Sequence, residues 1–238
     1  MNKTYTPTPG EAMREGGRAV RPRDAATLVL LRRIKGKPHV LMGQRSKGHK
    51  FMPDRYVFPG GRIDRADYHA KPATDLPKRT LNKLTKAASE AKARALALTA
   101  VRETFEETGV IIGKPVADPP RGGPAAWRPF YEAGFQPDLD GLEMICRAIT
   151  PPYRPMRFNA RFFLAEAEEI GGTAEDSHEL QYVDWISIKD ARKLKTPNIT
   201  QYVLDLVDQI TAGTLDPRRQ KRTPFFHVVH GKHLMESE

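Results

Sequence analysis

Short apolar runs in the first quarter of the chain predict β-strands. Residues 26–31 form one such run, and residues 39–42 form a second after a turn at 35–38 that contains glycine and proline. Two apolar runs around a turn of this composition predict a β-hairpin. Residues 56–58 predict a further short strand, which ends at Pro59-Gly60-Gly61.

Residues 91–108 have the composition and periodicity of a long helix, with many alanines, leucines and glutamates. Leu98, Val101 and Phe105 fall on one face at the spacing of a buried stripe. Glutamates 103 and 107 fall on the opposite face, with Glu106 at its edge. Gly109 is expected to end this helix, because glycine tolerates the left-handed conformation of a C-cap.

The remaining pattern mixes strands and helices without an internal repeat. We expect strands at 110–112, 162–164, 182–186 and 225–229, helices at 187–194 and 197–212, and a polar tail after the last strand. Such a mixture predicts an α+β domain built as an α/β/α sandwich around a mixed sheet. Residues 1–24 are polar and interrupted by prolines, so we expect a flexible N-terminal arm before one domain at 25–238.

Composition narrows the partners that this domain could bind. Lysine and arginine outnumber aspartate and glutamate by 39 to 29, for a formal charge of +10, which favours anionic partners. No nucleic-acid motif and no apolar stretch of membrane-spanning length accompany this charge. A solvated surface with basic stretches at 14–23 and 218–222 would explain much of the excess, so composition alone does not choose a partner. The missing motif and span disfavour nucleic acid and a membrane, which leaves a small phosphorylated metabolite as the expectation that the motifs have to support. The one cysteine, Cys146, excludes an internal disulfide, favours the cytoplasm and lies in an apolar run that predicts a buried thiol.

The stretch Arg102-Glu103-Thr104-Phe105-Glu106-Glu107 carries the candidate chemistry. Residues three and four apart on a helix are neighbours, so Glu103, Glu106 and Glu107 would converge into an acidic patch. Such oxygen ligands suit Mg²⁺ or Mn²⁺, which commonly bridge carboxylates to phosphates. Arg102 can reach Glu106 one turn on and hold its carboxylate. The alternative is a solvated helix face with ion pairs between neighbouring residues.

The glycines upstream strengthen the metal interpretation, because together the two segments resemble the Nudix box. The family pattern is a glycine, five residues, a glutamate, seven residues and then REUXEEXGU, where U is apolar. Gly61 matches the glycine, Asp67 stands where the family has glutamate, and residues 102–110 match the second half with Thr104 at an apolar position. Residues 68–101 place 34 positions where the family has seven, so we expect an inserted helical loop segment at about 68–90.

This resemblance implies a Nudix fold and hydrolysis of a diphosphate bond by water. Glu103, Glu106, Glu107 and the carbonyl of Gly61 would bind the Mg²⁺ or Mn²⁺ ions, which activate water and neutralise phosphoryl charge. Glu103 is the first choice for the general base, and Glu179 or Glu175 is the second. A regulator that binds a nucleotide without cleaving it is the competing interpretation, but it would not need all three glutamates.

The substrate is suggested by residues 41–61, which are similar to the segment before the box in coenzyme A diphosphatases. The pattern LLTxRSxxxRxxxGxxxFPGG is matched at Leu41, Arg45, Ser46 and residues 58–61, with Lys50 in place of an arginine. The resemblance implies that Arg45 and Lys50 contact substrate phosphates, although both could simply lie at an exposed strand end. Coenzyme A or an acyl-coenzyme A is thus the first expectation. Dinucleoside polyphosphates, ADP-ribose, NADH and capped RNA are the alternatives, and the sequence also allows a homodimer.

Overall fold

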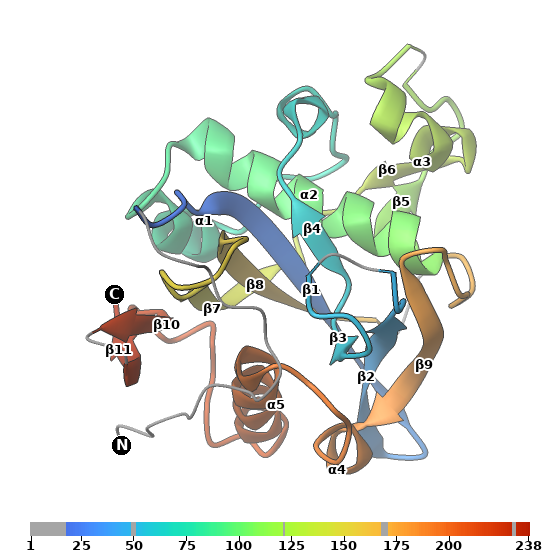
Figure 1. Cartoon of the computed structure of the whole chain (residues 1–238). Coiled ribbons are helices and arrows are strands. Elements are labelled where there is room, and N and C mark those ends of the chain that lie inside the picture. Colours follow the sequence, from blue (N-terminus) through green and yellow to red (C-terminus); the bar gives the residue numbers. More distant parts are fainter. Residues whose placement is uncertain (1–17, 49–50, 121, 168–170, 230–231) are drawn as a thin grey trace.

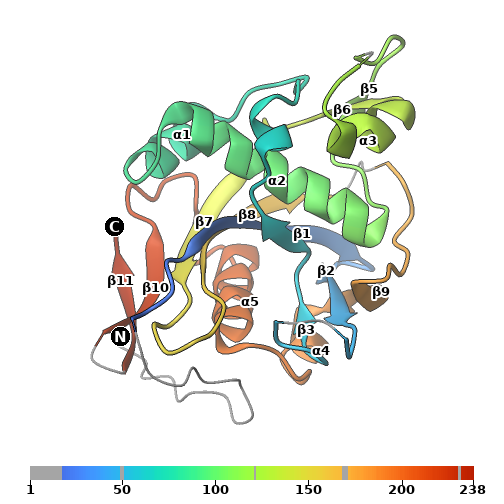
Figure 2. The same ribbon diagram turned by 45° about the horizontal axis from the view of Figure 1, so that its top comes forward.

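Two layers of helices enclose a mixed β-sheet (Figures 1 and 2). The computed structural model describes residues 18–48, 51–120, 122–167, 171–229 and 232–238. The strands of the larger sheet are β1 (Arg23–Ile34), β2 (Lys37–Arg45), β3 (Tyr56–Val57), β4 (Gly60–Arg62), β7 (Glu143–Ile149), β8 (Phe158–Glu166), β9 (Leu180–Ser187), β10 (Pro224–Val229) and β11 (Lys232–Ser237). Their order is β11-β10-β7-β8-β1-β2-β3, with β4 paired to β1 and β9 paired to β2. The β1–β8 and β7–β10 pairs are parallel and the others are antiparallel, so the sheet is mixed.

Helices from distant parts of the chain cover the two faces of this sheet, as Figure 2 shows. One face carries η1 (Arg65–Tyr68), α1 (Lys78–Thr85) and α2 (Glu90–Thr108), and the other carries α4 (Ile188–Ala191) and α5 (Asn198–Thr211). A small sheet of β5 (Gly113–Pro115) and β6 (Phe135–Pro137) projects beside α2 together with η2 (Ala125–Trp127) and α3 (Arg128–Glu132). The arrangement is the α/β/α sandwich predicted from the sequence.

Strand β1 divides the interior into two apolar cores. Successive side chains of a strand point to opposite faces of the sheet. Leu28 and Leu30 therefore pack on the α2 side, whereas Val29 and Leu31 pack on the α5 side. Cys146 is fully buried in the second core, as its apolar surroundings predicted. The two cores fix α2 and α5 against opposite faces of the strands that lead into the site.

Several predicted elements are confirmed. The hairpin of β1 and β2 turns at Lys35 and Gly36, and α2 ends at Gly109, whose φ is +72°. Helix α1 lies in the segment 68–90, and its Lys83 ammonium donates to the carbonyl of Pro217 over 2.6 Å. Leu76 and Leu84 of this segment belong to the core on the α2 side, so the segment is packed against the domain rather than looped out.

Other predictions were wrong. Residues 110–112 form no strand: the strand is β5, and the backbone of Ile111 makes an isolated bridge to Gly171. The apolar run reflects burial, because these three residues belong to the core on the α2 side. Part of the predicted polar tail is strand β11, which pairs with β10 at the sheet edge. Arg23 and Asp24, assigned to the arm, begin β1. Residues 1–17 of that arm lie outside the described residues.

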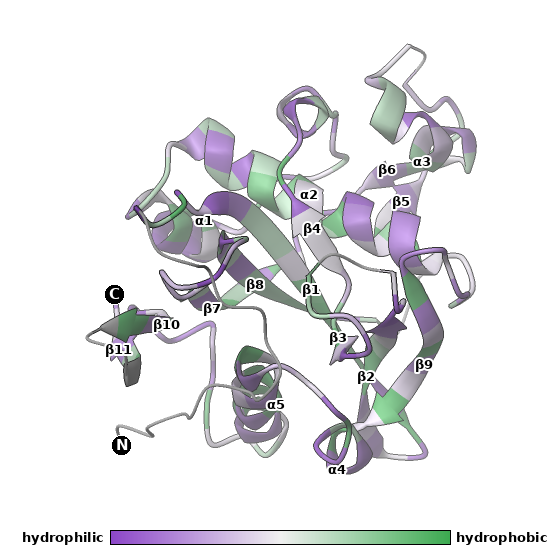
Figure 3. Ribbon diagram, in the orientation of Figure 1, coloured by the Kyte–Doolittle hydropathy of each residue, from purple (hydrophilic) through white to green (hydrophobic). Residues whose placement is uncertain are grey.

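None of the helices that the structure describes is long and apolar enough to cross a lipid bilayer. Hydrophilic residues are concentrated in the last turns of α2, where Figure 3 shows them beside β4. This end of α2 carries the candidate chemistry.

Candidate active site

The last two turns of α2 hold the three glutamates, but they hold them differently. Ser89 caps the start of the helix by accepting from the N–H of Lys92, and Gly109 donates to the carbonyl of Phe105 over 2.8 Å at its end. The side chain of Glu103 is 16% exposed and that of Glu106 is 41% exposed. Glu107 is buried. Glu103 and Glu107 thus face the protein, whereas Glu106 lies at the rim.

Strand β4 brings two glycines against these buried carboxylates. The N–H of Gly60 donates to Oε2 of Glu107 over 2.8 Å. A Cβ on Gly61 would lie 2.3 Å from the carboxyl carbon of Glu103. Gly60 has a φ of +156°, and a Cβ there would meet the carbonyl oxygen of Ala26 at 2.4 Å. A side chain at Gly60 would collide with the backbone of β1, and one at Gly61 would displace the Glu103 carboxylate, so the backbone of β4 approaches the carboxylates directly.

Asp67 anchors the arginine of the motif. Its side chain is fully buried and accepts two hydrogen bonds from the Arg102 guanidinium, at 2.8 and 3.0 Å. Arg102 also contacts Glu103 at 3.0 Å and Glu106 at 2.7 Å. The predicted Arg102–Glu106 contact is confirmed. Asp67, whose role the shortened side chain and the long spacing left open, holds Arg102 in place.

Trp127, the last residue of η2, completes this network from far along the chain. Its indole N–H donates to Oδ1 of Asp67 over 3.0 Å, and the Thr99 hydroxyl donates to Oδ2 over 2.8 Å. Trp127 is fully buried, and no spacing or motif in the sequence signals its hydrogen bond to a residue 60 positions away.

Burial and mutual repulsion raise the pKa values of the two inner carboxyls. Burial, and after it the charge of Glu103, raises the pKa of Glu107 to about 8. Burial raises the pKa of Glu103 to about 7, with the charge of Glu106 acting in the same direction and Arg102 opposing both. The pKa of Arg102 is raised, because its hydrogen bonds to Asp67 and the carboxylate charges outweigh its burial. The site therefore favours either protons or added positive charge near its carboxylates.

Without divalent cations, the free energy of unfolding should fall as the pH rises from 5 to 8. In the unfolded chain both glutamates have the ordinary pKa of 4.5 and lose their protons above that pH. In the folded protein their pKa values are higher, so Glu103 and Glu107 keep their protons to higher pH. The folded state thus binds more protons in this window, so its stability decreases with pH and levels off above about 8. Urea unfolding in a chelator measures this slope, and Glu107→Gln should flatten it. If the free energy of unfolding fell with pH equally in wild type and variant, the Glu107 carboxyl would not be the cause of the pH dependence.

An open cleft of about 690 Å³ joins most of the predicted site residues. Its described lining includes Arg45, Gly60, Gly61, Arg102, Glu103, Glu107 and Glu179, and does not include Glu106. Arg45 is half-buried, donates to the carbonyl of Phe51 over 2.7 Å and faces Glu107, Glu179 and Glu103. Glu179 stands closer to this cleft than Glu175, which is exposed in the preceding loop. Lys50 lies outside the described residues.

The carboxylates do not meet at one point. Within the described ranges, no three histidine, cysteine, aspartate or glutamate side chains are grouped so that they could hold one ion. The carboxylates of Glu103 and Glu107 lie against Gly61 and Gly60, whereas Glu106 pairs with Arg102 at the rim. The three glutamates therefore do not converge as predicted. Glu103 and Glu107 form an inner pair, and Glu106 is an outer carboxylate.

No model of a known protein family matches the sequence. Among known proteins, nudix hydrolase 7 of Caenorhabditis elegans, a provisional name, is 26% identical over 206 residues. The match covers 79% of this chain but only 61% of the nematode protein, so this chain spans less than two thirds of that relative.

A solved structure provides a more complete match. The crystal structure of a Nudix hydrolase from Alicyclobacillus acidocaldarius is 30% identical to this chain, with a TM-score of 0.61. The match covers 82% of this chain and 97% of the bacterial one. The likeness therefore includes almost the whole of a Nudix protein, and it confirms the fold predicted from the glycine and glutamate motif. This chain belongs to the Nudix hydrolase family.

Proposed function

We propose that the protein is a metal-dependent diphosphatase that acts on a small nucleoside diphosphate derivative. The observation that carries this proposal is the inner pair, Glu103 and Glu107, which is buried against Gly60 and Gly61 in an open cleft. Arg45 lines the same cleft as an always-charged group suited to phosphate oxygens. Buried carboxylates that face both backbone and an arginine fit a site for metal ions and phosphates.

The residues present fit a hard divalent cation. The Glu103 carboxylate occupies the space that a Cβ on Gly61 would fill, so the backbone of Gly61 lies directly beside its oxygen atoms. Glu103, Glu106, Glu107 and the carbonyl of Gly61 would hold Mg²⁺ or Mn²⁺. When bound, such ions lower the pKa of water and neutralise charge on the phosphoryl oxygens.

The side chains that line the cleft have separate roles in the proposed reaction. Water attacks one phosphorus of the diphosphate, the bridging P–O bond breaks, and two phosphate monoesters leave. Glu103 takes the proton of the attacking water, and Glu179 is the second candidate because it lines the cleft from the position just before β9. Arg45 orients a phosphate, and Arg102, which Asp67 holds, positions Glu103 and Glu106.

Coenzyme A or an acyl-coenzyme A is the substrate proposed first. This choice rests on the likeness of residues 41–61 to the segment before the box in coenzyme A diphosphatases. ADP-ribose, NADH, dinucleoside polyphosphates and capped RNA would suit the same chemistry. A non-catalytic nucleotide regulator would not require the buried pair of carboxylates.

Turnover over a panel of these compounds tests the proposal. The protein is incubated with Mg²⁺ or Mn²⁺ and each compound, and the products are identified by mass. We expect 3′,5′-ADP and 4′-phosphopantetheine from coenzyme A as the dominant products. Dominant cleavage of another member would replace the substrate and keep the chemistry, whereas no cleavage by folded, metal-loaded protein would contradict the diphosphatase proposal.

A further inference from the structure

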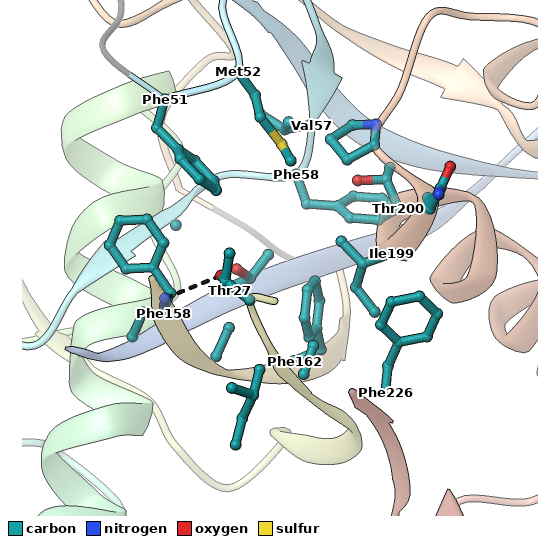
Figure 4. Close-up of a pocket in the computed structure, with 18 of the residues that line it drawn as sticks. Thr27, Phe51, Met52, Val57, Phe58, Phe158, Phe162, Ile199, Thr200 and Phe226 are labelled. Carbon is teal, nitrogen blue, oxygen red and sulfur yellow. Dashed lines mark hydrogen bonds between the residues drawn. The ribbon is translucent and has the colours of Figure 1, made fainter. Parts of the chain in front are cut away.

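A second cavity, of about 160 Å³, opens beside the glycine pair on the α5 side of the sheet (Figure 4). Its described lining shares Arg45, Phe51, Gly60, Gly61 and Phe158 with the cleft. A group bound at the carboxylates could therefore extend past the glycines into this cavity. Gly60 and Gly61 present only backbone atoms to both spaces, so no side chain of theirs separates the cavity from the cleft.

The walls of this cavity are mostly apolar. Phe58, Phe162, Ile199 and Phe226 line its inner part, and Figure 4 shows them around one space. Phe51 and Phe158 form the border with the cleft, where their rings meet edge to face at 4.9 Å between centroids. The hydroxyl of Thr150 already accepts a hydrogen bond from the N–H of Phe158 over 3.0 Å. The charged residues of the described lining are Arg45, at the border with the cleft, and Arg154, which is buried. The remaining, apolar walls favour an uncharged group with few polar atoms.

The volume limits the size of the occupant. Ala25, Ala160 and Ala148 stand opposite one another on β1, β8 and β7, so the floor of the cavity has no large side chain. A cavity of roughly 150 Å³ lined by apolar side chains is large enough for benzene. About six carbon atoms would thus fill the space, which is too little for a nucleoside.

We propose that this cavity is a substrate subsite for a compact, uncharged aliphatic group joined to the diphosphate. This inference rests on the proposed function and defines the substrate class further, as a diphosphate diester with one nucleoside arm and one aliphatic arm. Coenzyme A meets the requirement, because the second carbon from its diphosphate carries two methyl groups. ADP-ribose and dinucleoside polyphosphates carry a sugar at the corresponding place.

A series of alkyl esters of ADP tests the subsite. The esters carry methyl, butyl, hexyl or octyl groups on the second phosphate. Their kcat/KM is measured with the wild-type protein, and their Kd is measured calorimetrically with Glu103→Gln. We expect affinity to rise about fourfold per methylene, which corresponds to about 0.8 kcal/mol, and to level off near hexyl. A flat series, or tighter binding when adenosine replaces the alkyl group, would overturn the subsite.

Two substitutions in the cavity should shift, in opposite directions, the alkyl chain length at which affinity levels off. Ala148→Leu fills the floor, so affinity should level off at a shorter chain, and Ile199→Ala enlarges the space, so it should level off at a longer one. Ala212→Leu, the same change at the exposed end of α5, should reproduce the wild-type series. If Ala148→Leu does not fold, the wild-type series and Ile199→Ala decide. Binding that depends on chain length, without hydrolysis of any ester, would support the subsite and contradict the proposed function. Hydrolysis with no dependence on chain length would support the proposed function and overturn the subsite.

Discussion

Replacing Glu103 by glutamine should lower kcat by about 10²- to 10⁴-fold, the range over which general bases contribute. Glutamine keeps the shape of the side chain beside Gly61 but cannot take a proton from water. It also removes one charge from a crowded pair, so the metal-free variant should be at least as stable as wild type. Steady-state turnover of the best panel substrate and thermal unfolding in a chelator measure the two effects.

Glu90→Gln is the matched control for this experiment. Glu90 belongs to the same helix, is exposed and pairs with Arg94 at 3.0 Å, away from the cleft. Its replacement should change neither turnover nor stability by more than a small factor. Wild-type turnover in Glu103→Gln would exclude Glu103 as the base and move that role to Glu179, for which Glu179→Gln would then be the decisive variant.

Replacing Asp67 by alanine should reduce the free energy of unfolding by about 3–5 kcal/mol, the typical cost of removing one partner of a buried ion pair. The change leaves the buried guanidinium of Arg102 without its main partner, and it also removes the acceptor of the Trp127 and Thr99 hydrogen bonds. A protein of this kind has only about 5–15 kcal/mol in total. Urea unfolding followed by circular dichroism measures the loss.

Asp75→Ala provides the comparison. Asp75 also accepts hydrogen bonds from an arginine, Arg94, but its side chain is 53% exposed. Exposed pairs contribute about 0–1 kcal/mol, so this variant should stay close to wild type. If both variants lost the same free energy of unfolding, the buried Asp67–Arg102 pair would contribute no more to stability than an exposed ion pair does. The expected difference would instead establish that the network beneath Glu103 and Glu106 is a main support of the site.

Local spacing in the sequence by itself determined much of this protein. The hairpin of β1 and β2, helix α2 and its end at Gly109 all follow from patterns a few residues long, because the hydrogen bonds and side-chain contacts that form them are themselves local. The same holds for the contact between Arg102 and Glu106, which lie one helical turn apart. The Nudix motif could be identified for this reason.

Only the tertiary structure decided how the site is assembled. Glu107 meets Gly60 across 47 positions, and Trp127 reaches Asp67 across 60, so neither contact leaves a period in the sequence. Residues 110–112 were assigned to a strand because apolar runs look alike in strands and in loops that pack on a core. Strand β11 was missed because its polar residues lie at a sheet edge, where pairing with β10 rather than composition defines the strand. Burial and contacts between distant segments set the pKa values of Glu103 and Glu107 and the shape of the cavity at Phe51, and these depend on the whole fold.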